Sequence, residues 1–450
     1  MFGTTNIFRF LDFRNTHKMK KVLIISYYWP PSGGIGVHRC LKFAKYLQDF
    51  GWEPIIYAPL NAQYPYFDET NFKHIPENMT VLRRKIFEPF NLFKKLSGRK
   101  KSDSANPVYV RDRKLRKIDN LAIWIRGNFF IPDARCFWIK PSVRYLKKYL
   151  KENPVDAIFT DGPPHTNTEI GRRLSEETGI PWLMDFQDPW TQVDYYDMLK
   201  IGRRANKNHH KLEQKAFKTA KKTTIVSPTW KKDLESIGAK NVDVIVWGYD
   251  EDDFTSKQPT FDNHFSIVHA GQLGYDRRPD TLIKLLGDLK RDIPEFGKML
   301  KLKFAGTVDY AIVEMIKSAG LEENYFPLGN ISRPQAIELT LQAQILLLPL
   351  NIADNAKGRI PGKLFENMRA KRPIVCLGPT DSDVAEIITK TNTGRAFEYD
   401  NYENLKIHIL DLFEKFKSKT NIINAKDLEQ YTNRNLTRIL AIYLDEMVNL

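Results

Sequence analysis

The sequence predicts an α/β protein built of two doubly wound Rossmann-like domains that face each other across a cleft. Short apolar runs, typical of buried parallel strands, alternate with helical stretches along nearly the whole chain. A glycine loop follows the first apolar run of each half, at residues 30–37 and 271–278. At 450 residues the chain is also too long for one ordinary core and suits two domains of roughly 200 residues each.

The apolar content, the net charge and the cysteines of the chain limit the classes of protein to which it can belong. The chain is 42% apolar and 12% aromatic, which excludes a mainly disordered protein. Its net charge of +15 indicates anionic partners, namely a nucleotide diphosphate, an anionic membrane face or nucleic acid. The 3 cysteines have no metal-ligand spacing, so we expect buried thiols in a reduced compartment. No run of about 18 apolar residues exists, so we expect no membrane span and a cytoplasmic location.

The first strand is predicted over residues 21–28, after a loosely held extension at residues 1–18. Its lysine-flanked apolar run is too short for a signal peptide. The loop behind it contains Gly34 and Gly36, and glycines let the backbone approach a phosphate at a helix start. The loop lacks the GxGxxG pattern, and no acidic residue ends the second strand at 54–59, which disfavours a nicotinamide enzyme. A tight turn without a ligand is the alternative.

A basic segment at residues 94–117 interrupts the first half. It carries ten lysines and arginines against Asp103 and Asp112, and the aromatic residues Trp124, Phe129 and Phe130 follow it. Cations beside aromatics suit an anionic bilayer surface. A solvated basic loop is the alternative. Nucleic acid is the weaker interpretation because no nucleic-acid-binding motif accompanies the charge, and we expect no nucleic-acid partner.

Two sharp loops leave the next strands, at residues 161–165 and 187–190. Ligands of open parallel sheets lie at the carboxyl ends of strands, so these loops indicate a site. His165 and Asp188 are its candidates for an acid, a base or a group that orients a hydroxyl. Helix or turn capping is the alternative for both. A strand-like run at 242–250 closes this domain, predicted at 19–255, and a polar linker ends at residue 263.

The segment Gly358–Ala370 carries the strongest signal of the second half. A Pro-Gly loop opens a short helix in which Lys363 and Glu366 share one face. Unpaired backbone N–H groups, the helix dipole and a lysine together favour a diphosphate, and Glu366 would accept hydrogen bonds from sugar hydroxyls. An ordinary surface helix with an exposed ion pair is the alternative. The acidic run Asp381–Asp383 precedes a helix and is expected to cap it, with no metal.

These motifs resemble retaining family four glycosyltransferases of the GT-B fold. The resemblance runs from about Met19 to the end and is most specific over residues 267–394. It implies a nucleotide-sugar donor held chiefly by a C-terminal domain, here 264–425, a catalytic step that uses no metal or other cofactor, and a terminal helix at 426–450 that crosses back to the N-terminal domain.

The resemblance also implies roles for single residues. Glu366 matches the second acidic residue of the family's paired-glutamate motif, expected on the ribose hydroxyls, whereas the first falls on Gly358. Arg278 matches the diphosphate-binding basic residue, but its usual companion, an arginine, is Gln272 here. Charge balance, and not the resemblance, indicates that Lys363 and Arg359 could supply the lost positive charge. Asp188 falls where many members carry a histidine near the reacting sugar carbon.

The function predicted from these residues is a retaining transfer of a sugar to a saccharide or lipid-linked acceptor in surface glycan synthesis. Attack from the face of the departing diphosphate would retain configuration, with Lys363, Arg278 and the N–H groups of Gly34 and Gly362 stabilising the leaving group. An enzyme bound peripherally to the inner face of the plasma membrane fits the basic segment. The alternatives are a non-catalytic nucleotide-sugar-binding or scaffold protein and a nucleotide-sugar epimerase of the same fold.

Overall fold

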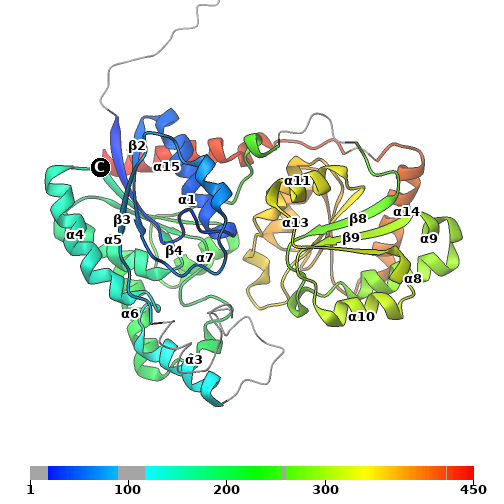
Figure 1. The fold of residues 1–450 in the computed structure, drawn as a ribbon, viewed down its shortest axis with the longest axis horizontal. Coiled ribbons are helices and arrows are strands. Elements are labelled where there is room, and N and C mark those ends of the chain that lie inside the picture. The colour runs from blue at the N-terminus through cyan, green and yellow to red at the C-terminus, as the bar shows by residue number, and fades with distance from the viewer. Residues whose placement is uncertain (1–18, 90–116, 255–259, 422, 450) are drawn as a thin grey trace, which may run out of the picture.

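The computed structural model describes residues 19–89, 117–254, 260–421 and 423–449. Two parallel sheets, each layered between helices, form two domains that lie side by side (Figure 1). The predicted fold class, two doubly wound α/β domains, is confirmed. No helix in the described ranges is both long and apolar enough to cross a bilayer.

The first sheet has seven parallel strands in the order β3-β2-β1-β4-β5-β6-β7. These strands are β1 (Lys20–Ile25), β2 (Trp52–Pro59), β3 (Thr80–Arg84), β4 (Ala157–Gly162), β5 (Trp182–Phe186), β6 (Lys222–Ile225) and β7 (Val242–Val244). The strand order reverses between β1 and β4, which is where such sheets bind ligands. The run predicted as one strand over residues 242–250 contains only the three-residue β7.

Side chains alternate between the two faces of this sheet, as the two-residue period of a strand requires. Leu23 faces the helices α4 (Ile139–Glu152) and α5 (His165–Thr178), while Ile24 faces α1 (Ile35–Tyr46) and α15 (Asn433–Val448). The C-terminal helix therefore lies in the core of the first domain, far along the chain from its other elements (Figure 1). The remaining helices of this domain are α3 (Lys117–Phe129), α6 (Arg203–Thr219) and α7 (Pro228–Ser236).

The second sheet has six parallel strands in the order β10-β9-β8-β11-β12-β13. These strands are β8 (Phe265–Ala270), β9 (Leu300–Ala305), β10 (Tyr325–Gly329), β11 (Ile345–Pro349), β12 (Ile374–Leu377) and β13 (Gly394–Phe397). Four helices pack on one face, namely α8 (Asp280–Asp292), α9 (Pro294–Met299), α10 (Tyr310–Ser318) and α14 (Tyr402–Lys417). Three cover the other, namely α11 (Arg333–Gln342), α12 (Lys363–Arg369) and α13 (Asp383–Lys390).

Candidate active site

The glycine loop of the first domain leaves β1 at the point where the strand order reverses. Gly34 precedes α1 with φ of 81°, a left-handed conformation that favours glycine. The Gly33 N–H donates to the Tyr66 carbonyl at 2.8 Å, which fixes the loop. Across the cleft, a Cβ added to Gly362 would lie 2.6 Å from Ile35 Cδ1. The loop with Gly34 and Gly36 therefore meets the start of α12 closely.

Lys363 is aimed at the glycine loop of the second domain. Its Nζ lies 3.3 Å from His269 Nε2 and only 2.6 Å from the place a Cβ would take on Gly271, whose φ is 126°. The His269 Nδ1 is 3.0 Å from the Leu347 carbonyl, so Nδ1 carries the proton and Nε2 can accept from the ammonium. Burial and the nearby charge of Arg277 lower the pKa of Lys363 to about 7. A cation that burial already disfavours gains from an anion placed beside it.

The first turn of α12 differs from the expectation of unpaired backbone donors. The helix has seven residues, and the N–H groups of Leu364 and Phe365 donate to Pro361 and Gly362 carbonyls at 2.9 and 3.3 Å. These short-range bonds satisfy two of the donors that a helix start usually leaves free. The Lys363 side chain is therefore a stronger candidate for anion contact than the backbone of this turn.

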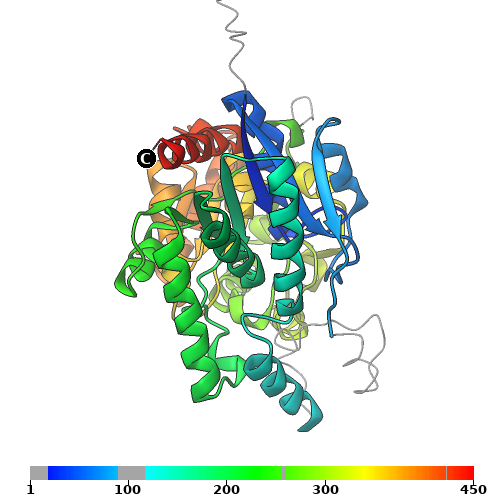
Figure 2. The same ribbon diagram turned by 90° about the vertical axis from the view of Figure 1, so that its left-hand side faces the viewer.

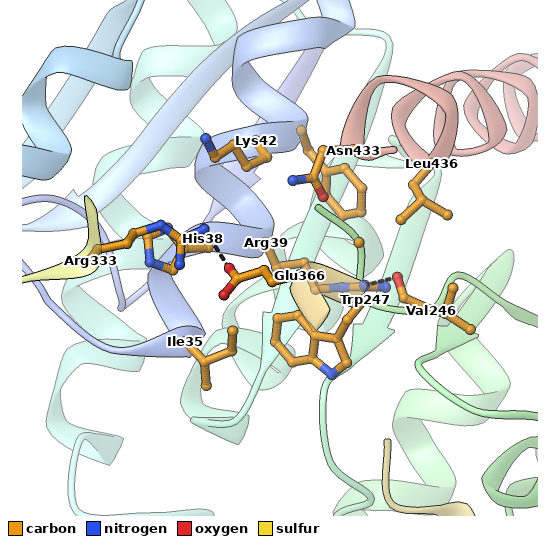
Figure 3. Close-up of a pocket in the computed structure, with 12 residues that line it drawn as sticks. Ile35, His38, Arg39, Lys42, Val246, Trp247, Arg333, Glu366, Asn433 and Leu436 are labelled. Carbon is orange, nitrogen blue, oxygen red and sulfur yellow. Dashed lines mark hydrogen bonds and ion pairs between the residues drawn. The ribbon is translucent and has the colours of Figure 1, made fainter. Parts of the chain in front are cut away.

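Glu366, one turn further, is held by a cation that the sequence analysis did not find. Its Oε1 lies 2.6 Å from Arg333 Nη2 (Figure 3). The same nitrogen lies 2.9 Å from Asp253 Oδ2 in the interdomain linker. Around this pair the side chains of His38 and Lys42 reach in from α1. The space left among them, about 20 Å³, holds little more than one water molecule. The domains are thus closed at this end of the cleft.

The two neighbouring arginines of the second glycine loop have different surroundings. Arg278 makes two contacts with Asp280, at 3.1 and 3.0 Å, on the partly exposed rim. Arg277 pairs with Asp276 and is the arginine close enough to depress the pKa of Lys363. Gln272 is exposed. Of the two arginines, Arg277 is the one placed to share an anion with Lys363, and an adjacent Arg-Arg pair offers no sequence signal to choose between them.

Asp188 faces charged groups of both domains. It follows β5 in the first domain, and burial together with Asp194 raises its pKa to about 6, against the opposing effect of Arg359 in the second domain. The Arg359 guanidinium itself lies 3.0 Å from Asp194 across the cleft. Asp188 and Arg359, predicted from separate motifs, are therefore brought together.

His165 is packed rather than presented to the cleft. Its ring stacks on Trp190 with centroids 4.5 Å apart and planes 3° from parallel, and it is 8% exposed. Burial lowers the pKa of His165 to about 3, so the ring stays neutral. The buried Nδ1 has no partner among the described residues. This geometry supports a packing role for the ring and offers no route by which it would titrate near neutral pH.

The acidic run before α13 is occupied by structural contacts. Ser382 accepts from the Ala385 N–H at 3.2 Å and so caps the helix. Asp383 accepts from the N–H and hydroxyl of Thr229, at 3.0 and 2.8 Å, and thereby joins α7 of the first domain. Asp381 pairs with Lys357. The three residues thus cap a helix, join the two domains and form an ion pair within the second domain.

Comparison with known proteins places the second domain. Residues 250–428 match the family model described as Glycosyl transferases group 1. This part of the chain is similar to the group 1 glycosyltransferases. No curated protein matches the chain in a sequence search.

Solved structures show that the whole chain, including residues 250–428, has the GT-B arrangement. Sucrose-phosphate synthase from Thermosynechococcus elongatus aligns over 96% of this chain and 98% of its own, with a TM-score of 0.56 and 12% identity. The Anabaena protein HepE in complex with UDP-glucose aligns over the same shares, with a TM-score of 0.53 and 13% identity. A UDP-N-acetylglucosamine 2-epimerase aligns over 95% of this chain and 96% of its own, with a TM-score of 0.52 and 12% identity.

The position at which the first glutamate of the pair was expected is occupied by a glycine that packs against the first domain. Gly358 lies against the indole of Trp230 in α7, and a Cβ added at this glycine would overlap that ring. Trp230 is 2% exposed, so the ring has little room to move. The position expected to hold the first glutamate of the pair is therefore a contact between the domains in this chain.

Restoring that glutamate is expected to weaken the protein. Gly358→Glu would force the Trp230 ring aside and bury a new carboxylate, and overpacking of this kind typically destabilises by about 1–3 kcal/mol. Thermal unfolding and small-angle scattering would detect the lower stability and a more open pair of domains. The double variant Gly358→Glu with Trp230→Ala removes the overlap and serves as the control. An unchanged melting temperature and shape for Gly358→Glu would contradict the close packing.

Proposed function

We propose that this protein is a retaining glycosyltransferase that binds a nucleotide-sugar between its two domains. The observation that carries the proposal is the placement of Lys363. Its ammonium lies against Gly271 at the reversal point of the second sheet, and the helix that carries it meets the glycine loop of the first domain. A diphosphate held there would touch a cation from one domain and a glycine backbone from the other. HepE, of the same fold, is known in complex with UDP-glucose.

In the proposed reaction an acceptor hydroxyl attacks the anomeric carbon while the bond from that carbon to the diphosphate breaks. The new glycosidic bond forms on the face that the diphosphate leaves, so the configuration is retained. An oxygen of the departing diphosphate takes the acceptor proton, and no metal or other cofactor takes part. Lys363 and Arg277 would stabilise the charge that grows on the leaving group.

Glu366 and Asp188 would act on the two sugars. In the proposed complex the Glu366 carboxylate accepts from ribose hydroxyls of the donor and keeps or exchanges its contact with Arg333. Asp188 would orient the acceptor hydroxyl. With a pKa of about 6, its carboxyl is an anion and a strong hydrogen-bond acceptor above that pH, and it becomes a weaker acceptor as it is protonated below it. Gly34, Gly36 and Gly362 would let the phosphates approach the backbone.

Donor entry requires the domains to separate. In the structure Arg359 pairs with Asp194, Asp383 bonds to Thr229, and Arg333 and Glu366 nearly fill the space beside them. The two ion pairs are partly exposed, and partly exposed ion pairs and single hydrogen bonds each contribute modestly. A group of such contacts therefore permits opening without unfolding of either core.

The test is a ligand-stabilisation screen of the intact chain against nucleotide-sugars and free nucleoside diphosphates. A donor present at about one hundred times its dissociation constant should stabilise the folded state by roughly 2.7 kcal/mol. We expect a selective rise in melting temperature, with slow release of diphosphate that a saccharide or lipid-linked acceptor accelerates. No shift with any compound would favour the non-catalytic scaffold.

An epimerase is the second candidate, because one solved structure of the same fold is a UDP-N-acetylglucosamine 2-epimerase. Such an enzyme would bind the donor but would need no second saccharide. Turnover that alters the sugar of the donor in the absence of any acceptor would support this alternative and contradict transfer.

We further propose that the enzyme acts at the cytoplasmic face of the plasma membrane in surface glycan synthesis. The sequence argument for this location was the basic segment at residues 94–117, of which all but the last residue lie outside the described part of the chain. The absence of any nucleic-acid-binding motif keeps nucleic acid out of the proposed partners.

A further inference from the structure

Helix α3 presents a row of large apolar side chains to solvent. Leu121, Trp124, Ile125 and Phe129 each expose between 38% and 67% of their surface. Their spacing places them on one face of the helix. The rings of Trp124 and Phe129 also contact each other, with centroids 5.6 Å apart. A contiguous exposed patch of this kind usually marks an interaction surface.

The opposite face of α3 is firmly attached to the first domain. Ala122 and Ile123 are buried, and a Cβ on Gly127 would overlap the Leu199 carbonyl. The helix α3 therefore packs closely against the turn that precedes α6. Asn128 donates to the Lys200 carbonyl at 3.1 Å and accepts from the Gly202 N–H at 2.7 Å. The exposed row is therefore held in a fixed orientation, on the side of α3 that faces away from the core of the first domain.

The helix beside α3 carries exposed cations. The N-terminal part of α6 lies beside α3 at the lower end of the first domain (Figure 1, Figure 2). It exposes several basic side chains, namely Arg203, Arg204, Lys207 and Lys211. Amphipathic surfaces that lie in a membrane interface combine an apolar face with flanking lysine and arginine.

We propose that this α3 face docks the enzyme on an anionic lipid bilayer, with Leu121, Trp124, Ile125 and Phe129 inserted at the level of the lipid headgroups and the α6 cations on anionic headgroups. The positive charge of α6 favours an anionic bilayer over a second copy of this chain as the partner of the α3 face. A symmetric dimer through α3 would bring the cations of two α6 helices together, whereas an anionic bilayer complements them.

Docking in this orientation would also position the candidate site. The charge of Arg126, on the inner side of α3, opposes the rise in the pKa of Tyr28 that burial causes, and the Tyr28 ring lies 3.3 Å from where a Cβ would stand on Gly36. The helix thus connects the lipid surface to the glycine loop of the first domain. The docking itself is independent of the proposed reaction, but a lipid-linked acceptor rests on that proposal.

Sedimentation of the full chain with vesicles tests the docking. We expect binding to vesicles that contain phosphatidylglycerol and little binding to pure phosphatidylcholine. The variant Leu121→Gln, Trp124→Gln, Phe129→Gln should lose at least about a hundredfold in partitioning, because three large apolar side chains no longer enter the bilayer interface. Arg204→Gln with Lys207→Gln should lose about fivefold per charge.

Matched controls lie on the second domain. Tyr310→Gln with Ile407→Gln removes equally exposed apolar groups, and Lys298→Gln with Lys426→Gln removes two exposed cations. Neither should change vesicle binding. Equal sedimentation of the α3 variant and the native chain, no binding by the native chain, or a dimer that the α3 variant dissociates would each overturn the proposal. Donor-induced thermal shifts in the same variants separate this failure from failure of the proposed function.

Discussion

Replacing Lys363 by methionine is expected to weaken binding of the nucleotide-sugar at least about thirtyfold. The half-buried Lys363 side chain places its ammonium against Gly271, and removing one member of the charge pair that it would form with the donor typically loses about 2 kcal/mol or more of binding free energy. Methionine keeps the length of the side chain and its packing. Isothermal titration of the native and variant chains with the donor found in the screen measures the effect.

Two further variants make that result specific. Lys298→Met removes an exposed lysine from α9, on the side of the second domain away from the first (Figure 1), and should leave the affinity unchanged. Glu366→Gln should also weaken the donor, since the amide accepts fewer hydrogen bonds from ribose and pairs less strongly with Arg333. Full donor affinity in both Lys363→Met and Glu366→Gln would contradict the proposed donor site.

The pKa of Lys363 gives this binding a pH dependence. With a value of about 7 in the free protein, the lysine loses its proton as the pH rises through neutrality, so donor affinity should fall above about pH 7. The slope should vanish in Lys363→Met. The effect on folding has the opposite sign. An unfolded lysine keeps its proton to roughly pH 10.4, so between these values the unfolded chain binds more protons and this group makes the folded state more stable as the pH rises.

The central strands could be predicted from sequence because parallel strands buried on both faces appear as continuous apolar runs. The edge strands β3, β10 and β13 could not. The strands Thr80–Arg84 and Tyr325–Gly329 leave much of their side-chain surface exposed. The strand Gly394–Phe397 consists mainly of small and polar residues and so lacks a continuous apolar run. Their pairing depends on a neighbouring strand that already stands in place, so the local sequence carries a weak signal.

The candidate site divides in the same way. Residues within one loop and helix, such as Lys363 and Glu366, could be grouped from spacing alone. Arg333, the partner of Glu366, comes from a different helix, and Asp194 meets Arg359 only when the domains face each other. The expected first glutamate is replaced by Gly358, which packs against Trp230 of the other domain. A single sequence holds no local pattern for contacts between distant segments.

Replacing Arg39 by methionine is expected to lower the free energy of unfolding by about 3–5 kcal/mol, the usual effect of stranding one partner of a buried ion pair. Arg39, in α1, makes a two-fold contact with Asp185 at 2.6 and 2.7 Å, and the side chains are 2% and 0% exposed. It also donates to the carbonyls of Ile245 at 2.8 Å and Val246 at 3.1 Å. Chemical denaturation of both chains, monitored by tryptophan fluorescence and circular dichroism, gives the difference.

The partner substitution identifies the cause. In Arg39→Met with Asp185→Leu no charge is left stranded, so we expect much of the stability to return. Arg434→Met is the matched control, because Arg434 pairs with Asp49 at 61% and 42% exposure and such a pair contributes less than about 1 kcal/mol. A loss below 1 kcal/mol in Arg39→Met would contradict a buried pair. Arg39 also links α1, which follows the first glycine loop, to the segment that places Trp247 in the cleft. We therefore expect Arg39→Met to weaken donor binding as well.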